Sequence, residues 1–489
     1  MLSRPTVMTF TRIHQLLVPA RAFALVTVSS TQPRTAARPA HVKSTLPRPD
    51  PPRPGSLSGW VFSRLEDRAG LPGLVSGQTS LSQLDTWAQS LRLGSSLLDL
   101  GLQPGMVVAT VLPNKTELPL AVLGATEVGL AVAPICPTSS TESICRQLVS
   151  SGASAVITTG ELAAKVEKAC CYSGLLDALV LLMEAADGEE GSLVVGGNTR
   201  DWAGLVERDV ETWPELEPAQ HLELPALLAW SGGRHHAAFT HRQLLAGLAE
   251  LEELWRGGAL QGAGQQITAL ITVPATRPSS IAAILFHLSC GHRVVIDRKC
   301  PSLAGTLEQY KPSVYHLGPV GAQWVADTEM AGRLGSVRQL VLHTTAAPLE
   351  PATLEKLQRQ LGPGSTAAQL LCRQEVFTAS HWCSLPGTAY SAGLPLPGAE
   401  CRVVGQDGTT VTSHTVGRLL VRGPSVMAGL WHRGAVHTEP LLQTEGWFDT
   451  GDSAYCDEHS NTFLVDVHPY NGKFSYRTCK YGKLSGSSK

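Results

Sequence analysis

The sequence predicts an α/β protein built on parallel sheets, because apolar strands and helices alternate along the chain at the spacing of βαβ units. In the first half, short apolar runs at 107–112, 130–134 and 153–158 are separated by stretches with helical apolar spacing. The alternation returns between 270 and 361. Hydrophobic residues form 43% of the 489 residues and charged residues 16%, which fits a globular chain with a large core.

Capping residues and apolar spacing locate the individual elements. Ser80 or Ser82 is predicted to cap a helix whose inward residues are Leu84, Trp87, Ala88 and Leu91. A helix is expected over 117–129, and another begins at Thr141 with inward residues Ile144, Leu148 and Val149. Further strands are predicted at 225–230, 270–274, 293–296, 340–343 and 463–465, and further helices at 281–288 and 354–361.

The two ends of the chain differ in composition from its middle. The first 49 residues contain no acid, seven Lys or Arg and many Ser and Thr, which is typical of a mitochondrial transit peptide. An unstructured tail is the alternative. Five prolines at 44–58 favour a linker over 50–75, followed by one large domain over 76–466. Residues 467–489 hold five Lys or Arg and no acid, and they are expected to form a basic tail.

Charge, hydropathy and cysteine usage exclude several classes of protein. The net charge of −2 gives no electrostatic reason to expect nucleic-acid binding. No apolar run reaches the roughly 18 residues that a membrane span needs. The eleven cysteines show neither zinc-ligand spacing nor the pattern of a disulfide scaffold, so they are expected to be free thiols.

A Thr-Gly-Asp segment at 450–452 is the strongest functional signal, although alone it predicts only a turn. A carboxylate held after a strand can accept two hydrogen bonds from the hydroxyls of a ribose. Three other segments surround it in a distinctive order: Gly-Leu-Pro-Leu-Pro-Gly at 393–398, a Gly-rich stretch at 417–429, and Phe-Leu-Val-Asp at 463–466.

In this order and spacing, the segments resemble the adenylate-forming superfamily, which includes acyl-CoA synthetases, 4-coumarate-CoA ligases and luciferases. The resemblance covers roughly residues 75–466. It implies a large domain of two doubly wound sub-domains and a β-rich third sub-domain from about residue 385. The implied reaction activates a carboxylic acid with ATP and Mg²⁺ through an acyl-adenylate, then transfers the acyl group to coenzyme A.

The resemblance also assigns residues to the nucleotide. Asp452 aligns with the carboxylate that binds ribose. The segment 369–375 aligns with an aromatic-Gly-x-Thr-Glu motif, which makes Glu375 the expected catalytic and magnesium-binding residue. Gln374 replaces the Thr that touches phosphate, and Leu371 replaces the aromatic that stacks on adenine.

Two further segments align with the phosphate loop and with the acyl and adenine pocket. Ser231 and Gly232 begin the loop, where backbone N–H groups are expected to face phosphate oxygens. Thr345 and Ala346 lie in the small-residue run that lines the pocket, and Thr345 replaces a Gly.

The sequence departs from the family where the family does its chemistry. The loop at 231–239 lacks the threonines, proline and lysine, and Arg234 is the one candidate to replace the charge. The turn at 275–278 lacks the family's His. A hinge Arg is replaced by Val467, and 23 residues follow Asp466 where the family has a further domain with a catalytic Lys. Lys473 is not expected to replace that Lys, because turn residues surround it.

Three hypotheses follow from this mixture of kept and lost features. The chain is a mitochondrial acyl-CoA synthetase by descent with weak or no ligase activity. Alternatively it is a regulatory protein that binds a nucleotide, an acyl ligand or a partner. The third hypothesis is an incomplete isoform of an active ligase. The identity of the acid and the oligomeric state do not follow from the sequence.

Overall fold

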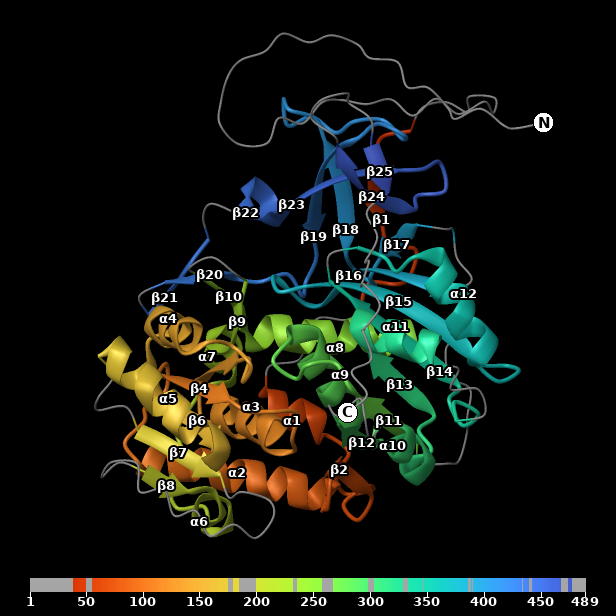
Figure 1. Ribbon diagram of the computed structural model, residues 1–489. Helices are drawn as coiled ribbons and strands as arrows, with labels where there is room; N and C mark the ends of the chain where they lie inside the picture. Colours follow the sequence, from red (N-terminus) through yellow and green to blue (C-terminus); the bar gives the residue numbers. More distant parts are fainter. Residues whose placement is uncertain are drawn as a thin grey trace, which may run out of the picture.

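The computed structural model describes residues 38–49, 55–174, 179–183, 199–231, 235–256, 267–297, 303–328, 333–345, 347–385, 388, 390–432, 434–438, 442–467 and 474–476. Two large sheets organise these residues, with helices packed around them (Figure 1). The predicted mixed α/β class is confirmed. No described helix has both the length and the apolar character needed to cross a membrane.

The first sheet has a parallel centre, extended at one edge by antiparallel strands. Its strands lie in the order β21 (Ala435–His437), β20 (Gly429–His432), β10 (His236–Thr240), β9 (Pro225–Trp230), β5 (Ala131–Ile135), β4 (Val107–Val111), β6 (Ala153–Thr159), β7 (Leu179–Met183) and β8 (Thr199–Asp201). Its helices are α2 (Gln83–Asp99), α3 (Glu117–Glu127), α4 (Thr141–Ser151), α5 (Gly160–Ser173), α6 (Trp202–Glu207) and α7 (Pro218–Glu223). Strands β9, β5, β4 and β6 are buried apart from a few positions near their ends, which explains the continuous apolar runs in the sequence.

The second sheet begins as a parallel unit and continues as an antiparallel one. Its parallel strands are β2 (Pro72–Ser76), β12 (Arg293–Ile296), β11 (Thr268–Ile271), β13 (Val314–Leu317), β14 (Gln339–Thr344) and β15 (Thr366–Arg373), with β3 (Thr79–Ser82) antiparallel at the edge. Its helices are α8 (His241–Arg256), α9 (Pro278–Ser289), α10 (Leu303–Tyr310), α11 (Pro319–Asp327) and α12 (Pro351–Gln360).

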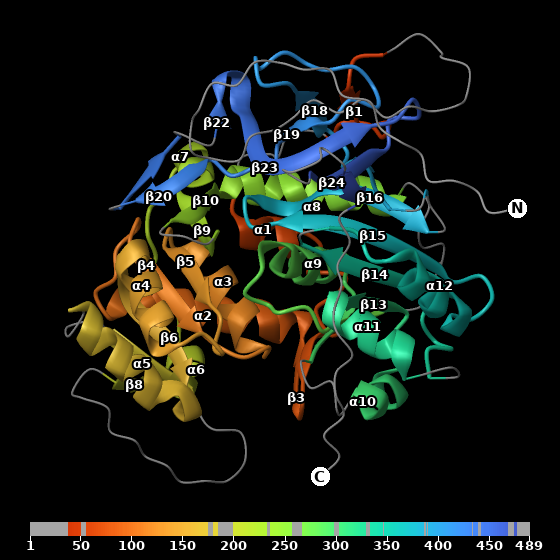
Figure 2. The same ribbon diagram turned by 45° about the horizontal axis from the view of Figure 1, so that its top comes forward.

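The antiparallel continuation is the β-rich third unit, which caps the two parallel units (Figures 1 and 2). It runs through β16 (Val376–Leu385), β17 (Ser391–Pro395), β24 (Thr462–Val467), β23 (Trp447–Cys456), β19 (Gly417–Arg422), β18 (Glu400–Val404) and β1 (His41–Lys43), with β22 (Leu442–Gln443) and β25 (Phe474–Tyr476) alongside. Because this unit also supplies β20 and β21 to the first sheet, it joins both parallel units.

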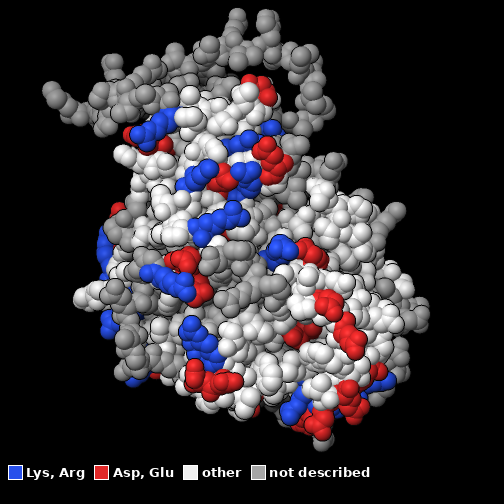
Figure 3. All heavy atoms as spheres, turned by 180° about the vertical axis from the view of Figure 1, so that it is seen from behind, with Lys and Arg blue, Asp and Glu red and all other residues white. Residues whose placement is uncertain are grey.

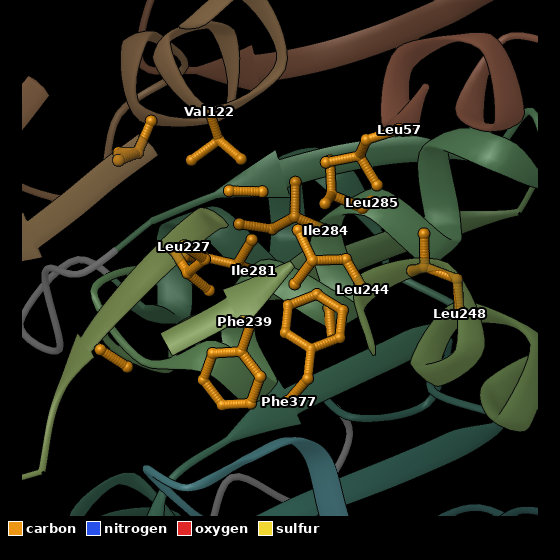
Figure 4. Packing of buried hydrophobic residues seen from close by; sticks show 14 of the residues in the cluster. Leu57, Val122, Leu227, Phe239, Leu244, Leu248, Ile281, Ile284, Leu285 and Phe377 are labelled. Carbon is orange, nitrogen blue, oxygen red and sulfur yellow. The ribbon is translucent and has the colours of Figure 1, made fainter. Parts of the chain in front are cut away.

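One apolar core holds the units together. Side chains of α8 and α9, among them Leu244, Leu248, Ile281 and Ile284, pack against Phe239 and Phe377 (Figure 4). Burying a side chain of this size stabilises a fold by about 1.5–3 kcal/mol. The two helices therefore fix the position of the segment that precedes α9, which borders the candidate site.

Helix α2 buries a face that differs in part from the one predicted, although Trp87 packs against the core as expected. Ser82 does cap it, in a capping box with Asp85. However, Leu84 is 44% exposed, and the inward residues include Ser90, Leu93, Gly94 and Leu97. The reason is a close approach of α2 to α3, where a Cβ at Gly124 would lie 2.3 Å from the carbonyl oxygen of Ser90. The predicted inward residue Val149 of α4 is likewise 58% exposed.

Two boundaries near the N-terminus also differ from the prediction. The linker expected over 50–75 contains α1 (Leu57–Val61), which Ser56 caps and whose Leu57 is fully buried in the core. Leu57 and Val61 are buried, so this segment folds against the core although prolines precede it. Strand β1, inside the expected transit peptide, pairs with β18 and buries Val42.

The contact between α2 and α3 predicts the effect of enlarging Gly124. Gly124→Ala should lower the free energy of unfolding by roughly 1–3 kcal/mol, because the added methyl group overpacks the helix contact. Gly160→Ala is the matched control, since a Cβ there meets nothing within 4 Å. Urea unfolding of both variants measures the difference, and equal stabilities would contradict the described packing.

The position of β1 limits where a presequence could be cleaved. If residues 1–49 direct import, we expect cleavage after residue 20 but before Arg38, because the backbone carbonyl of Arg38 accepts a hydrogen bond of 2.8 Å from the N–H of Ser413. N-terminal sequencing of protein isolated from mitochondria tests this. An intact Met1 peptide in that fraction, or a purely cytosolic protein, would contradict it.

Candidate nucleotide cleft

A polar cleft of about 230 Å³ lies where β9, β14 and β15 end. Its lining residues are Ser231, Arg277, Pro278, Ser279, Thr345, Cys372, Arg373, Gln374 and Glu375. The carboxyl ends of parallel strands are the usual place for ligand sites in α/β sheets. The cleft therefore has the position expected of a binding site in this fold.

Gln374 and Glu375 form the two-residue turn that joins β15 to β16, in which Arg373 pairs with Val376. The backbone carbonyl of Glu375 accepts a hydrogen bond of 2.9 Å from the N–H of Met427. Burial raises the pKa of the Glu375 carboxyl, and the Arg373 charge acts in the opposite direction. The turn holds one carboxylate and one amide at the cleft.

Asp452 is bound by an arginine of its own chain. Its carboxylate forms an ion pair with the guanidinium of Arg373, and the two side chains are only 12% and 10% exposed. Arg373 also donates a hydrogen bond of 3.4 Å to the carbonyl of Thr450. A buried carboxylate is costly without a positive partner, and Arg373 supplies one.

The sequence predicted that the Thr-Gly-Asp segment follows the end of a strand. It lies instead inside strand β23. Residues 450–452 bulge opposite Leu419, with Gly451 at a φ of 70°. Thr450 Oγ1 donates a hydrogen bond of 2.8 Å to the carbonyl of Leu419 and accepts one of 3.2 Å from the N–H of Asp452. The bulge re-aims the Asp452 side chain towards β15.

The structure brings four of the residues assigned from sequence to one cleft. These are Ser231, Thr345, Gln374 and Glu375. Asp452 reaches the same place through its ion pair with Arg373. Gly232, Arg234, Ala346 and Lys473 lie outside the described residues. Leu371, at the position of the adenine-stacking aromatic, is 1% exposed and belongs to the apolar core.

Sequence reasoning did not assign five of the lining residues to the site: Arg277, Pro278, Ser279, Cys372 and Arg373. Arg277 precedes α9 and lines both this cleft and a second cavity of about 290 Å³ beside it. The available signal was the turn at 275–278, which the sequence analysis interprets only as the loss of a His.

Asn114 fixes the turn at 275–278. Its side chain donates a hydrogen bond of 3.0 Å to the carbonyl of Val273 and accepts one of 2.8 Å from the N–H of Ala275.

An apolar pocket of about 170 Å³ lies on the other side of Ser279, between α8, α9 and strands β13–β16. Its walls include Leu254, Trp255, Phe286 and Trp382. Ser279 lines both this pocket and the polar cleft, and His343 lines both this pocket and the second cavity. The three cavities therefore meet around these two side chains.

A chain of four hydrogen-bonded histidines runs from Ser279 along the pocket. Ser279 Oγ lies 3.2 Å from His343 Nδ1, and His343 Nε2 lies 2.9 Å from His316 Nδ1. His316 Nε2 lies 2.9 Å from His287 Nε2, and His287 Nδ1 lies 2.9 Å from His292 Nδ1. Neutral imidazole has one donor and one acceptor nitrogen, so four neutral rings can satisfy every link of this chain.

Burial keeps these imidazoles neutral. It lowers the pKa of His343 to about 3 and, with Arg68 nearby, that of His292 to about 4. It also lowers the pKa values of His287 and His316 well below the usual range. Among the described residues, no group of three or more His, Cys, Asp or Glu side chains is arranged to hold a metal ion. The four histidines thus form a hydrogen-bonded path of imidazoles.

Comparison with known proteins supports the resemblance seen in the sequence. The pattern described as "AMP-binding enzyme" matches residues 62–431, more than half of the chain. The chain belongs to this family. It is therefore a member of the adenylate-forming superfamily that contains acyl-CoA synthetases, as the sequence predicted.

Named relatives of this family member are CoA ligases. The chain is 28% identical over 430 residues to 4-coumarate–CoA ligase 1 of Oryza sativa subsp. japonica, covering 84% of this chain and 74% of the relative. Its fold matches a long-chain-fatty-acid-CoA ligase of Archaeoglobus fulgidus with a TM-score of 0.73, 16% identity and coverage of 88% and 87% of the two chains. It also matches O-succinylbenzoate coenzyme A synthetase of Bacillus subtilis in complex with ATP and magnesium ion, with a TM-score of 0.68, 18% identity and coverage of 86% and 82%.

The described cleft does not fit the tight binding of ATP. The carboxylate aligned with the ribose ligand is already paired with Arg373, and Leu371 is buried where an adenine would need a stacking surface. No lysine occurs between 231 and 239 to bind the phosphates. Magnesium in such sites is held largely through the nucleotide phosphates, so Glu375 alone does not make a metal site.

The neutral histidines predict how stability depends on pH. Their pKa values are lower in the folded chain than the ordinary value near 6.5, so the unfolded chain binds more protons below that pH. The free energy of unfolding should fall as the pH drops from about 6.5 to 4, by up to roughly 1.4 kcal/mol per pH unit for each histidine. His343→Gln should show a shallower decline, by about one proton, in urea titrations at several pH values. Equal slopes for the wild type and His343→Gln would contradict the account of buried, neutral histidines.

Proposed function

We propose that this chain is an acyl-CoA synthetase by descent, with weak or no ligase activity. The observation that carries the proposal is the ion pair between Arg373 and Asp452. In the family reaction as the resemblance implies it, this carboxylate binds ribose. Here a ribose would have to displace a guanidinium that is itself shielded from solvent, which costs more than binding to a free carboxylate.

Lost charges at the phosphate end support the same proposal. The first family step relies on positioning and on neutralising phosphate charge. Each missing charged contact in such a site costs on the order of a few kcal/mol, and two or three together reduce the rate by many orders of magnitude. Arg277 is a cation in the cleft, but it stands on the α9 side and is not part of the loop after β9.

The surviving part of the site favours a small carboxylic acid over a nucleotide as the retained ligand. The apolar pocket accepts a compact hydrophobic group, and Ser279 lies on its boundary with the polar cleft, where Arg277 would bind a carboxylate. The relatives named as ligases of coumarate and fatty acids suggest this chemical class. Coenzyme A would be the second partner only if ligase activity remained.

Two further elements of the proposal concern partners and location. Lys and Arg are interspersed with Asp and Glu on the face shown in Figure 3, and a surface of mixed sign gives no reason to propose nucleic acid as a partner.

We propose a mitochondrial location from the acid-free, basic composition of residues 1–49.

Releasing Asp452 should improve nucleotide binding. Arg373→Gln removes the paired charge and keeps a hydrogen-bond donor, so we expect AMP to bind at least about tenfold more tightly than to the wild type, equivalent to 1.4 kcal/mol. Isothermal titration calorimetry measures the affinity, and thermal melting shows that the variant is folded.

The control is Arg422→Gln, which breaks an ion pair with Glu400 elsewhere in the third unit and should leave AMP affinity unchanged. Adding Asp452→Asn to Arg373→Gln should remove the gain. Tight AMP binding by the wild type would contradict the proposed function.

A further inference from the structure

Ser279 and His343 have the arrangement of a nucleophile and its general base. The Oγ to Nδ1 distance of 3.2 Å is within reach of proton transfer. His343 Nε2 faces His316 Nδ1 at 2.9 Å, so the tautomer with its proton on Nε2 leaves Nδ1 as the acceptor that a base requires. His316 holds His343 in this orientation, as the acid does in a catalytic triad.

The surroundings of Ser279 match what acyl transfer requires. Its side chain lines both the apolar pocket, which can hold an acyl chain, and the polar cleft, which can admit a leaving group and water. As the second residue of the twelve-residue helix α9, Ser279 has an N–H with no acceptor within the helix, and Arg277 is the N-cap residue of that helix. These positive groups can stabilise an oxyanion that forms beside Ser279.

We propose that Ser279 is a catalytic nucleophile, activated by His343, that hydrolyses small apolar esters or thioesters. This activity requires no nucleotide, so it is independent of the proposed loss of ligase activity. Ser279 Oγ attacks the carbonyl carbon while its proton moves to His343 Nδ1. The bond from carbon to the leaving oxygen or sulfur then breaks, and His343 returns the proton to that atom. Water attacks the acyl-serine in the same way, which releases the carboxylic acid and restores Ser279.

The chain of histidines lets the transferred proton move away from the buried His343. When His343 accepts a proton on Nδ1, its Nε2 proton can pass to His316 and onward through His287 to His292. His292 is the one half-buried ring of the four. Positive charge is thereby spread over several rings, which lowers the cost of charging a buried imidazole.

A neighbouring thiol is the competing nucleophile. Cys372 Sγ lies 3.8 Å from His343 Nδ1, but burial raises the pKa of this thiol to about 12, so it stays protonated. Ser280 is the matched control hydroxyl, because it follows Ser279 in α9 and donates instead to the carbonyl of Val273 at 3.2 Å.

The test uses the full chain without nucleotide, a fluorophosphonate probe and p-nitrophenyl butyrate. We expect mass spectrometry to find the probe on Ser279 and not on Cys372, and we expect butyrate release that Ser279→Ala abolishes while Ser280→Ala retains it. His343→Gln should slow labelling by about a hundredfold or more. If that variant does not fold, labelling of the wild type still decides the matter. A wild type that is unlabelled at Ser279, or hydrolysis that survives in Ser279→Ala, would overturn the proposal.

Discussion

The ion pair between Arg373 and Asp452 is the interaction on which the site depends. It joins the last parallel strand of the second sheet to a bulged strand of the antiparallel unit, at the edge of the cleft. Removing one partner of a buried pair typically costs about 3–5 kcal/mol, because the other charge is left without compensation. The pair therefore holds the third unit against the cleft and occupies the carboxylate that the family uses for ribose.

The other side of the cleft is organised by neutral groups. Asn114 fixes the turn before α9, and that turn sets the positions of Arg277 and Ser279. Behind Ser279, four neutral imidazoles share hydrogen bonds without a buried charge. A loss of phosphate-binding groups on the β9 side thus coexists with an ordered polar network on the α9 side. The chain has the fold of its family, and the residues where its cavities meet differ from the family's motifs.

The fold was predictable from sequence, because strands such as β4 and β6 are continuous apolar runs and capping residues such as Ser82 mark helix starts. The inward face of α2 was not, because it is set by the approach of Gly94 to Gly124 and not by the apolar spacing around Leu84. Short-range patterns describe single elements well, whereas contacts between elements depend on small residues whose role appears only when the elements meet.

The same limit applies to the site. Glu375 and Gln374 could be assigned because they lie within one aligned segment, and the structure places both at the cleft. The pairing of Arg373 with Asp452 could not be predicted, since the two residues belong to segments joined only by the sheet order. The histidine chain was also missed, because its members come from α9, the turn after it, β13 and β14 and show no common spacing in the sequence.

ATP–pyrophosphate exchange is the measurement that tests the central claim most directly. The purified full chain would be supplied with ATP, Mg²⁺ and a panel of aromatic and aliphatic carboxylic acids, with an active CoA ligase as the positive control. The account predicts no exchange above background with any acid, because the ribose carboxylate is paired and the phosphate charges are missing. Exchange that depends on the added acid and is lost in Asp452→Ala would show that this carboxylate still serves adenylation, and it would contradict the account.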